Sequence, residues 1–261
     1  MKSITSKDNP QYKELKLIAT SSQARRKAGK TLLDGVHLCE AYFQHLGQPA
    51  LCVVSDLAMN DHEVHQLLMQ CEQKNVPCIS LPEALYQAVS QVENGVGIMF
   101  LIATPEPELP KIINETSVAL DNLQDPGNLG SILRSAAAAG VKNVLCSAGT
   151  ALAWSPKVMR AGMGAHFLLN IFENVDLETA LSTTTLPVLA TSSHTTKTIY
   201  QTDLNQSVVW LFGHEGQGVS DTLMTKATDT VTIPQQAAIE SLNVAASAAI
   251  CFFEQVRQQL K

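Results

Sequence analysis

The sequence contains no apolar run long enough to cross a membrane. Its longest runs, such as residues 96–103, are far shorter than the roughly 20 residues that a membrane-spanning helix needs. No cleavable signal peptide is recognised either, so we expect a cytoplasmic protein with no membrane association. Aromatic residues make up only 5% of the chain, but 45% of its residues are apolar and 16% are charged. This composition is that of an ordinary globular protein and argues against a disordered chain.

Cysteines are few and scattered. None belongs to a C-x-x-C pair, and no histidine stands beside them at a spacing typical of a metal site. We therefore expect reduced, mostly buried thiols and no bound metal. A catalytic cysteine is disfavoured, because no nearby residue would obviously activate a thiol. The six are Cys39, Cys52, Cys71, Cys78, Cys146 and Cys251.

Excess positive charge is also lacking over the chain as a whole. The net charge of −6 argues against a nucleic-acid partner, because phosphate contacts need Lys and Arg. The charge is unevenly distributed, however: residues 1–30 carry +6 and the remainder carries −12. A basic segment on an acidic body is typical of an RNA-binding arm. A solvated basic helix that keeps this end of the chain soluble explains the same charges.

Helical and strand-like patterns alternate in the first half. Residues 8–28 have a polar helical pattern, and residues 30–37 lead into a second helix with Leu38, Ala41, Tyr42 and His45 on one side. Strands are then predicted at 51–54, 76–79 and 97–102, with helices at 61–74 and 82–89. This order predicts a small α/β unit.

Three prolines and two glutamates in residues 103–110 interrupt this pattern and predict a linker. Alternation resumes beyond it, which predicts a mostly parallel sheet covered by helices. The predicted strands are 117–120, 143–146, 187–190, 208–212 and 230–233, and the last helix is 241–259 with Ala245, Ala249, Phe252 and Val256 on its buried stripe.

Three segments of the second half carry side chains suited to chemistry. In the first, residues 120–134, a turn precedes a helix with Asn128 as its expected N-cap and Arg134 nearly two turns further on. In the second, residues 211–218, glycines flank Glu215 directly after an apolar strand, at the strand end where α/β folds bind ligands. Glu215 could pair with Arg134 and orient its guanidinium.

The third segment opens the last helix with Ser241 and Asn243. Each segment also has an ordinary explanation: a surface ion pair for Arg134, an acidic turn residue for Glu215, and simple helix caps for the last two. For His214 and His37 a local hydrogen-bonding role is favoured over catalysis.

Together, the order and spacing of these segments resemble the three signature motifs of the SpoU (TrmH-like) RNA ribose 2'-O-methyltransferases of the SPOUT superfamily. The resemblance implies that Arg134 is essential for methyl transfer and that Asn128, Glu215, Ser241 and Asn243 complete the catalytic set. It also implies S-adenosylmethionine as the cofactor. Main-chain groups of Gly213, Ile233 and Leu242 would bind it, and the loop that begins with Thr191 and Ser192 would form a further wall of the pocket. Leu211 is also expected to bind the cofactor.

The resemblance further implies a C-terminal trefoil knot, with a mostly parallel sheet and helices on both faces, and a homodimer built on it. The N-terminal α/β unit is similar to the RNA substrate-binding domain that precedes many such enzymes. The expected parts are a basic helical arm at 1–22, an RNA-binding domain at 23–103, a linker at 104–115 and the catalytic domain at 116–261. Arg25, Arg26, Lys27, Lys30 and His37 are the expected RNA contacts.

The expected substrate is structured RNA, with ribosomal RNA favoured over transfer RNA because of the separate N-terminal domain. The chain departs from the family at Gln235–Gln236–Ala237, where the family usually has a segment that contains a glycine. The loss of this glycine could alter a cofactor loop that needs positive φ. A non-catalytic RNA-binding or ribosome-assembly factor on the same fold is therefore an alternative. A nicotinamide dehydrogenase is disfavoured, because no G-x-G-x-x-G follows an early strand.

Overall fold

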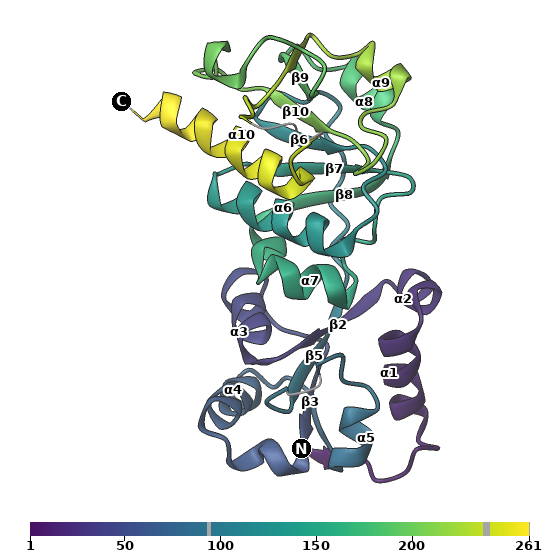
Figure 1. Ribbon diagram of the computed structural model, residues 1–261. Helices are drawn as coiled ribbons and strands as arrows, with labels where there is room; N and C mark the ends of the chain where they lie inside the picture. Colours follow the sequence, from purple (N-terminus) through teal and green to yellow (C-terminus); the bar gives the residue numbers. More distant parts are fainter. Residues whose placement is uncertain (93–94, 237–240, 261) are drawn as a thin grey trace. The chain divides into compact units, whose positions relative to one another are not determined.

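The computed structural model describes residues 1–92, 95–236 and 241–260, and these form two units (Figure 1). The first contains residues 1–105 together with the segment Trp154–Met159, and the second contains the described residues of 106–153 and those from Arg160 onward. The division between residues 105 and 106 lies inside the predicted linker. The sequence did not predict that Trp154–Met159 belongs to the first unit.

A five-stranded mixed sheet forms the centre of the first unit, with strand order β1-β4-β3-β5-β2. Strand β5 runs antiparallel to β2 and β3, whereas β3, β4 and β1 are parallel. In chain order the elements are β1 Lys2–Ser3, α1 Pro10–Thr20, α2 Ser22–Ala28, β2 Lys30–Asp34, α3 Val36–His45, β3 Leu51–Ser55, a 3-10 helix Asp56–Asn60, α4 His62–Gln73, β4 Cys78–Leu81, α5 Glu83–Gln87 and β5 Ile98–Ala103.

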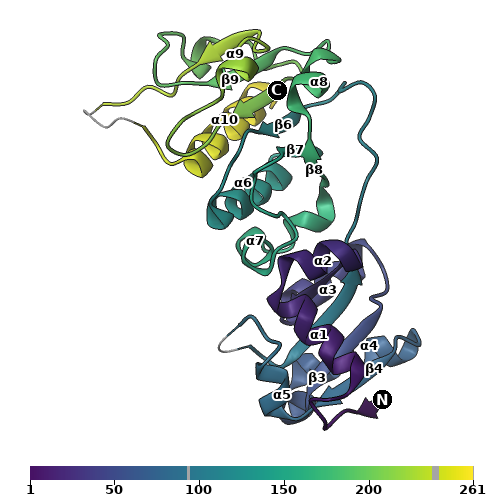
Figure 2. The same cartoon turned by 90° about the vertical axis from the view of Figure 1, so that its right-hand side faces the viewer.

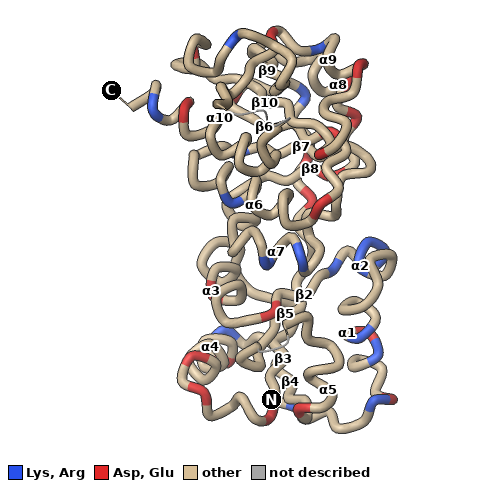
Figure 3. The backbone as a smooth tube through the Cα atoms, in the orientation of Figure 1, with Lys and Arg blue, Asp and Glu red and all other residues tan. Residues whose placement is uncertain are grey.

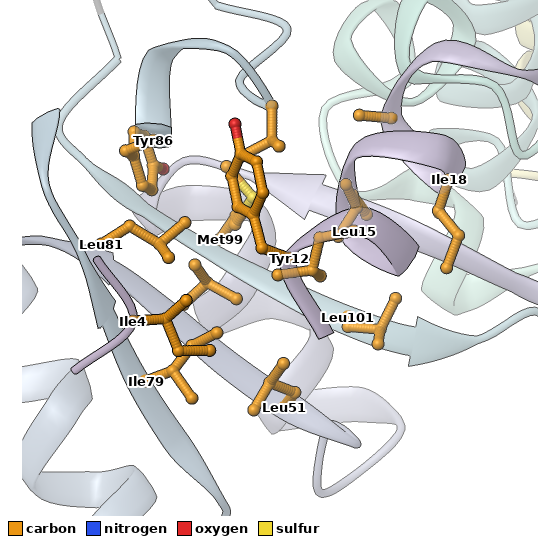
Figure 4. Close-up of a cluster of buried hydrophobic side chains, with 14 residues drawn as sticks. Ile4, Tyr12, Leu15, Ile18, Leu51, Ile79, Leu81, Tyr86, Met99 and Leu101 are labelled. Carbon is orange, nitrogen blue, oxygen red and sulfur yellow. The ribbon is translucent and has the colours of Figure 1, made fainter. Parts of the chain in front are cut away.

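Helix α1 packs on this sheet and does not form a separate arm. Its side chains Tyr12, Leu15 and Ile18 are almost fully buried in a core cluster with apolar residues of β3, β4 and β5 (Figure 4). The predicted arm over residues 1–22 is therefore wrong, because the apolar face of α1 covers the sheet. The single helix expected over residues 8–28 is also two helices, since Ser21 caps α2 with its side chain.

The second unit contains a six-stranded sheet, with strand order β11-β9-β10-β6-β7-β8, in which every pairing is parallel. Its elements are β6 Ser117–Leu120, α6 Pro126–Ala138, β7 Asn143–Ser147, a 3-10 helix Ala165–Leu168, β8 Asn170–Val175, α8 Leu177–Ser182, β9 Val188–Thr191, a 3-10 helix Ile199–Gln201, β10 Val209–Phe212, α9 Asp221–Met224, β11 Asp229–Val231 and α10 Val244–Gln259. Helix α7, Pro156–Gly162, begins in the segment that belongs to the first unit.

Helices cover both faces of this sheet, as expected for parallel strands joined by crossovers. Helices α6 and α10 pack together on one face, and α8 and α9 pack on the other (Figures 1 and 2). On the α10 face, the buried indole of Trp210 donates a hydrogen bond to Gln255 over 2.9 Å. The predicted parallel α/β fold is confirmed, while the trefoil knot stays a prediction.

Several local expectations were wrong. Strands β1, β2 and β8 were not predicted, and β4 begins two residues later than expected. Helix α6 begins at Pro126 with Asp125 as its N-cap, so Asn128 lies inside the first turn and is not the cap. The buried stripe of α10 includes Ala245 and Phe252, but Ala249 and Val256 are only partly buried. No helix among the described residues is long and apolar enough to span a membrane.

Candidate active site

The three segments singled out in the sequence come together at one edge of the parallel sheet. The first follows β6 and the second follows β10, and these two strands are neighbours. Strand β9 lies on the other side of β10 and ends at Thr191. Strand β11 pairs with the far edge of β9, and Ile233 follows it in the chain. Because parallel strands end on the same edge, the loops after them meet there, which is where open α/β sheets bind ligands.

Glu215 holds the loop after β10 to the start of α6. Its Oε1 accepts hydrogen bonds from the main-chain N–H of Asp125 at 3.0 Å and from Nδ2 of Asn128 at 3.1 Å. Its Oε2 accepts a third from the N–H of Gln124 at 3.3 Å. The carboxylate therefore occupies the N-terminal end of a helix, where negative charge is stabilised.

The third segment joins this pair through Asn128. The Nδ2 of Asn243 donates to Oδ1 of Asn128 over 2.9 Å. The Oδ1 of Asn243 in turn accepts from the N–H groups of Ala245 and Ala246, which makes it the N-cap of α10. Each amide thus uses its oxygen as an acceptor and its nitrogen as a donor. Asn243, Asn128 and Glu215 form one hydrogen-bonded chain, called here the amide relay.

The hydrogen bonds also set the ionisation of the carboxylate. Partial burial of Glu215 opposes its ionisation, but the N–H groups of Asp125, Gln124 and Glu215 itself, with the Asn128 amide, outweigh burial and hold the pKa of Glu215 below its ordinary value. Its oxygens are occupied by N–H donors. Glu215 is therefore a positioning group and is poorly suited to accept a proton from a substrate.

Arg134 lies on α6 with an exposed side chain. The predicted ion pair between Arg134 and Glu215 is wrong: among the described residues neither makes an ion pair, and Glu215 bonds Asp125, Gln124 and Asn128 instead. The physical reason is that Asp125 caps α6 through the N–H of Asn128, 2.7 Å away, which leaves the Asn128 side chain free to reach Glu215.

Gly213 permits a close backbone approach after β10. A Cβ at this position would lie 2.0 Å from the carbonyl carbon of Gly218 and 2.1 Å from the nitrogen of Val219. His214 closes the same loop through paired main-chain bonds with Gly218, and its Nδ1 accepts from the N–H groups of Gly216 and Gln217. The expectation of a local hydrogen-bonding role for His214 is confirmed.

Among the described residues, the main-chain groups expected to hold the cofactor have no hydrogen-bond partner. Within the described part of the chain, the N–H and C=O groups of Gly213, Ile233 and Leu242 make no hydrogen bonds to other protein groups. Peptide groups of this kind, after strands β10 and β11 and before α10, suit a ligand with adenine, ribose and amino-acid polar atoms, because each such group needs a partner when it is covered. S-adenosylmethionine therefore fits the donors and acceptors present.

The remaining residues expected in the pocket differ in their surroundings. Thr191 and Ser192 are half-buried at the end of β9, where Ser192 donates its N–H to the carbonyl of Val231. Leu211 is fully buried in the core between the sheet and α8 and α9. Its side chain therefore supports the strand that carries Gly213 and does not line an open surface.

The departure from the family motif lies partly beyond what the structure describes. Gln235 and Gln236 are exposed, whereas Ala237 and Glu240 fall outside the described residues. Ser241 is exposed and makes no hydrogen bond to other described residues. Its predicted catalytic role stays a prediction.

The residues expected to contact RNA are of two kinds: some bond other protein groups, and others are exposed. Arg25 donates from Nη1 to the carbonyls of Ile18 and Ala19, which ties α2 to the end of α1. Lys30 pairs with Glu14 at 2.7 Å. Figure 3 shows Lys and Arg positions in blue along α2. Arg26 and Lys27 on this helix and His37 on α3 are exposed, so these three remain the candidates for RNA contact.

Sequence reasoning missed several groups that hold the site together. The N–H groups of Gln124 and Asp125 bind Glu215, and the carboxylate of Asp121 accepts from the N–H of Ser220 at 2.9 Å. Main-chain donors carry no residue-type signal, so only the turn chemistry around Asp125 could have indicated them.

Comparison with known proteins places this geometry in a family. Residues 115–253 match the model of the SpoU rRNA Methylase family. An uncharacterized tRNA/rRNA methyltransferase of Synechocystis is 32% identical over 98% of this chain and 94% of its own length. The 23S rRNA (guanosine(2553)-2'-O)-methyltransferase RlmP of Bacillus subtilis is 29% identical over 97% and 98%.

A solved crystal structure of an RNA 2'-O ribose methyltransferase has the same fold. It is 28% identical, covers 99% of this chain and 100% of its own, and superposes with a TM-score of 0.83. The matched residues include all three segments joined by the amide relay. The chain therefore belongs to the SpoU rRNA methylase family and is an S-adenosylmethionine-dependent methyltransferase.

Proposed function

We propose that the protein methylates a ribose 2'-hydroxyl of large-subunit ribosomal RNA. The observation that carries this proposal is the amide relay, which joins the three family segments at the ligand-binding edge of the sheet. The name of the Bacillus subtilis relative, a 23S rRNA 2'-O-methyltransferase, supports this choice of substrate. A transfer RNA substrate is the competing choice.

S-adenosylmethionine, when bound, supplies a methyl group on a sulfonium, which an oxygen nucleophile attacks. The main-chain groups of Gly213, Ile233 and Leu242 would hold it, with Thr191 and Ser192 beside them. The contribution of the protein is then to place the ribose and to stabilise charge that develops on its oxygen.

Arg134 is the side chain best suited to act on the ribose. It projects from the helix that the amide relay fixes, and none of its donors is used by another described residue. A guanidinium is a permanent cation with five donors, so Arg134 does not act as a base. The 2'-hydroxyl proton passes to solvent water as the methyl group is transferred, and Arg134 orients the ribose-phosphate and stabilises the oxyanion character that this proton loss creates. Asn128, Glu215 and Asn243 fix the helix end and the adjoining loop.

The first unit would hold the RNA, with Arg26, Lys27 and His37 as the exposed contacts. The working form is a cytoplasmic homodimer joined through the second unit. The exposed apolar side chain of Phe253 on α10, 48% accessible, supports such an interface. Sedimentation of the wild type and of Phe253→Glu tests it: the wild type should be a dimer and the variant a monomer.

Replacing Arg134 by Ala tests the mechanism. Turnover on ribosomal RNA with radiolabelled S-adenosylmethionine should fall at least ~100-fold, the size expected for one lost charge-stabilising group, while calorimetry shows unchanged cofactor affinity. Lys142→Ala removes another exposed cation of the same unit and should leave both unchanged. Near-normal turnover by Arg134→Ala would refute the assigned role.

Mapping tests the substrate. Ribose 2'-O-methylation should be compared across ribosomal and transfer RNA from cells with and without the gene. Loss of one site in large-subunit ribosomal RNA, restored by the wild type but not by Arg134→Ala, is the expected result. Loss of a site in transfer RNA alone would contradict the proposal and identify transfer RNA as the substrate.

A further inference from the structure

Three cysteines meet on one face of the sheet in the first unit. Cys52 on β3 and Cys78 on β4 are partners in the parallel ladder, so their side chains point to the same face. Their strand neighbours Val53 and Ile79 belong to the core cluster with α1 and therefore point to the other face; Figure 4 shows Ile79 in this cluster. Cys71 reaches the cysteine face from the last turn of α4.

Main-chain hydrogen bonds hold Cys71 and Cys52 to the segment that leads into Cys78. The N–H of Val76 donates to the carbonyl of Cys71 over 2.9 Å, and the N–H of Cys52 donates to the carbonyl of Pro77 over 2.9 Å. Asn75 makes the intervening turn at φ 57°. The connection from α4 to β4 is thereby fixed at both ends, and the thiols are pre-organised by backbone bonds.

The sulfur atoms of Cys52, Cys71 and Cys78 all lie within 4.8 Å of one another. A metal bound by three thiolates at about 2.3 Å would hold its sulfurs about 4 Å apart, so only small side-chain shifts are needed. Cys52 and Cys71 are fully buried, whereas Cys78 is half-buried and is the most exposed of the three.

We propose that Cys52, Cys71 and Cys78 bind one thiophilic d10 metal ion, Cu⁺ or Zn²⁺, through their three sulfurs. Soft thiolate ligands select these ions over magnesium or calcium. Three sulfurs complete a Cu⁺ site, whereas Zn²⁺ takes a fourth ligand from solvent on the Cys78 side. The site lies in the first unit and takes no part in methyl transfer; the ion fastens α4 to the sheet.

Metal binding at this cluster should depend on pH. In the structure the thiol of Cys78 donates a hydrogen bond to the carbonyl of Val76 over 3.2 Å. Because only thiolates bind the ion, the metal must displace the thiol protons, so binding should weaken as pH falls.

Metal binding by the reduced, metal-free full-length protein tests the proposal. Zn²⁺ is titrated against a chromophoric zinc chelator and Cu⁺ against bicinchoninate. One ion per chain should bind, release protons and raise the melting temperature. Cys71→Ala and Cys78→Ala should each weaken binding by at least ~100-fold, more than the roughly 10–100-fold that loss of an outer hydrogen-bond partner costs.

Cys39→Ala is the matched control, because Cys39 is equally buried in the same unit but lies outside the cluster. It should bind one ion with wild-type affinity. Circular dichroism establishes that each variant is folded, and Cys78→Ser serves if an alanine variant is not, since Cys78 is the least buried of the three. Failure of both ions to bind at one per chain, unchanged binding by a folded Cys78 variant, or a disulfide that persists under reductant would each overturn the proposal.

Discussion

The side-chain amide of Asn243 donates a hydrogen bond to the amide oxygen of Asn128, 115 residues earlier in the chain. Asn128 also donates to Glu215. The positions of three segments therefore depend on one another: the start of α10, the start of α6 and the loop after β10. A change at any member should therefore disturb the catalytic edge as a whole.

Asn128→Asp should harm the site more than Asn128→Ala. The aspartate would place a carboxylate oxygen where the amide nitrogen now lies, 3.1 Å from Oε1 of Glu215, and two like charges at that distance repel. We expect a loss of roughly 10- to 100-fold in turnover, equivalent to about 1–3 kcal/mol. The deficit should be smaller at about pH 5 than at about pH 8, because the two carboxyls can then share a proton.

Steady-state kinetics of both variants over this pH range check the prediction. Asn128→Ala loses the donor without adding charge, so its deficit should not depend on pH in the same way. Equal deficits for the two variants at every pH would contradict the charge argument.

Gly213→Ala should abolish cofactor binding. Its Cβ would come within 2.0 Å of the backbone at Gly218, so the loop between them must move. Gly216→Ala is the matched control in the same loop, since its Cβ would meet only the His214 ring at 3.8 Å. Calorimetry with S-adenosylmethionine should show no binding by the first variant and near-normal binding by the second; normal binding by Gly213→Ala would exclude the loop from the cofactor site.

The exposed and structural arginines of α2 should behave differently. The double variant Arg26→Ala, Lys27→Ala should weaken binding to ribosomal RNA fragments at constant melting temperature. It should also reduce the slope of log affinity against log salt by about 0.7–0.9 for each lost phosphate contact. Filter binding at several salt concentrations measures both.

Arg25→Ala should instead lower the melting temperature, because its guanidinium bonds the carbonyls of Ile18 and Ala19. An Arg25 variant with unchanged stability and a reduced salt slope would reverse this division between structural and RNA-binding cations.

His166 should make the second unit sensitive to acid. Burial lowers the pKa of His166 to about 4 from 6.5, and the hydrogen bond between its Nε2 and the carbonyl of Ala153 opposes this only in part. The unfolded chain therefore takes up a proton before the folded chain does as pH falls. Stability should drop between about pH 6.5 and 4, by up to roughly 3 kcal/mol from this group, and level off below.

Urea unfolding over this range, for wild type and His166→Gln, checks the prediction. Glutamine can still donate to Ala153 but does not titrate, so the variant should lose less stability over the same window. His194→Gln, at an exposed loop position, should follow the wild type. Parallel curves for the wild type and His166→Gln would show that His166 does not carry the effect.

The strands that the sequence predicted well are those buried on both faces. Ser117–Leu120 and Val209–Phe212 lie in the middle of the parallel sheet and consist almost entirely of buried residues, so their apolar runs mark them clearly. Strand β8, Asn170–Val175, was missed because it lies at the sheet edge and contains exposed or half-buried polar residues. Its pattern has neither a continuous run nor strict alternation.

Side-chain pairings over long separations could not be predicted from local patterns. The resemblance indicated that Asn128, Glu215 and Asn243 belong to one site, but not that the two amides and the carboxylate bond one another directly. The cysteine cluster was missed for a related reason. Its members come from a helix and two strands, so no local spacing brings them together.

The amide relay also constrains when activity can arise during synthesis. Asn128 and Glu215 emerge from the ribosome before Asn243, which they need to complete the chain of hydrogen bonds. A nascent polypeptide that stops short of α10 therefore lacks a finished catalytic edge, however well its earlier strands have paired. An enzyme whose substrate is ribosomal RNA would thus be inactive until α10 has folded.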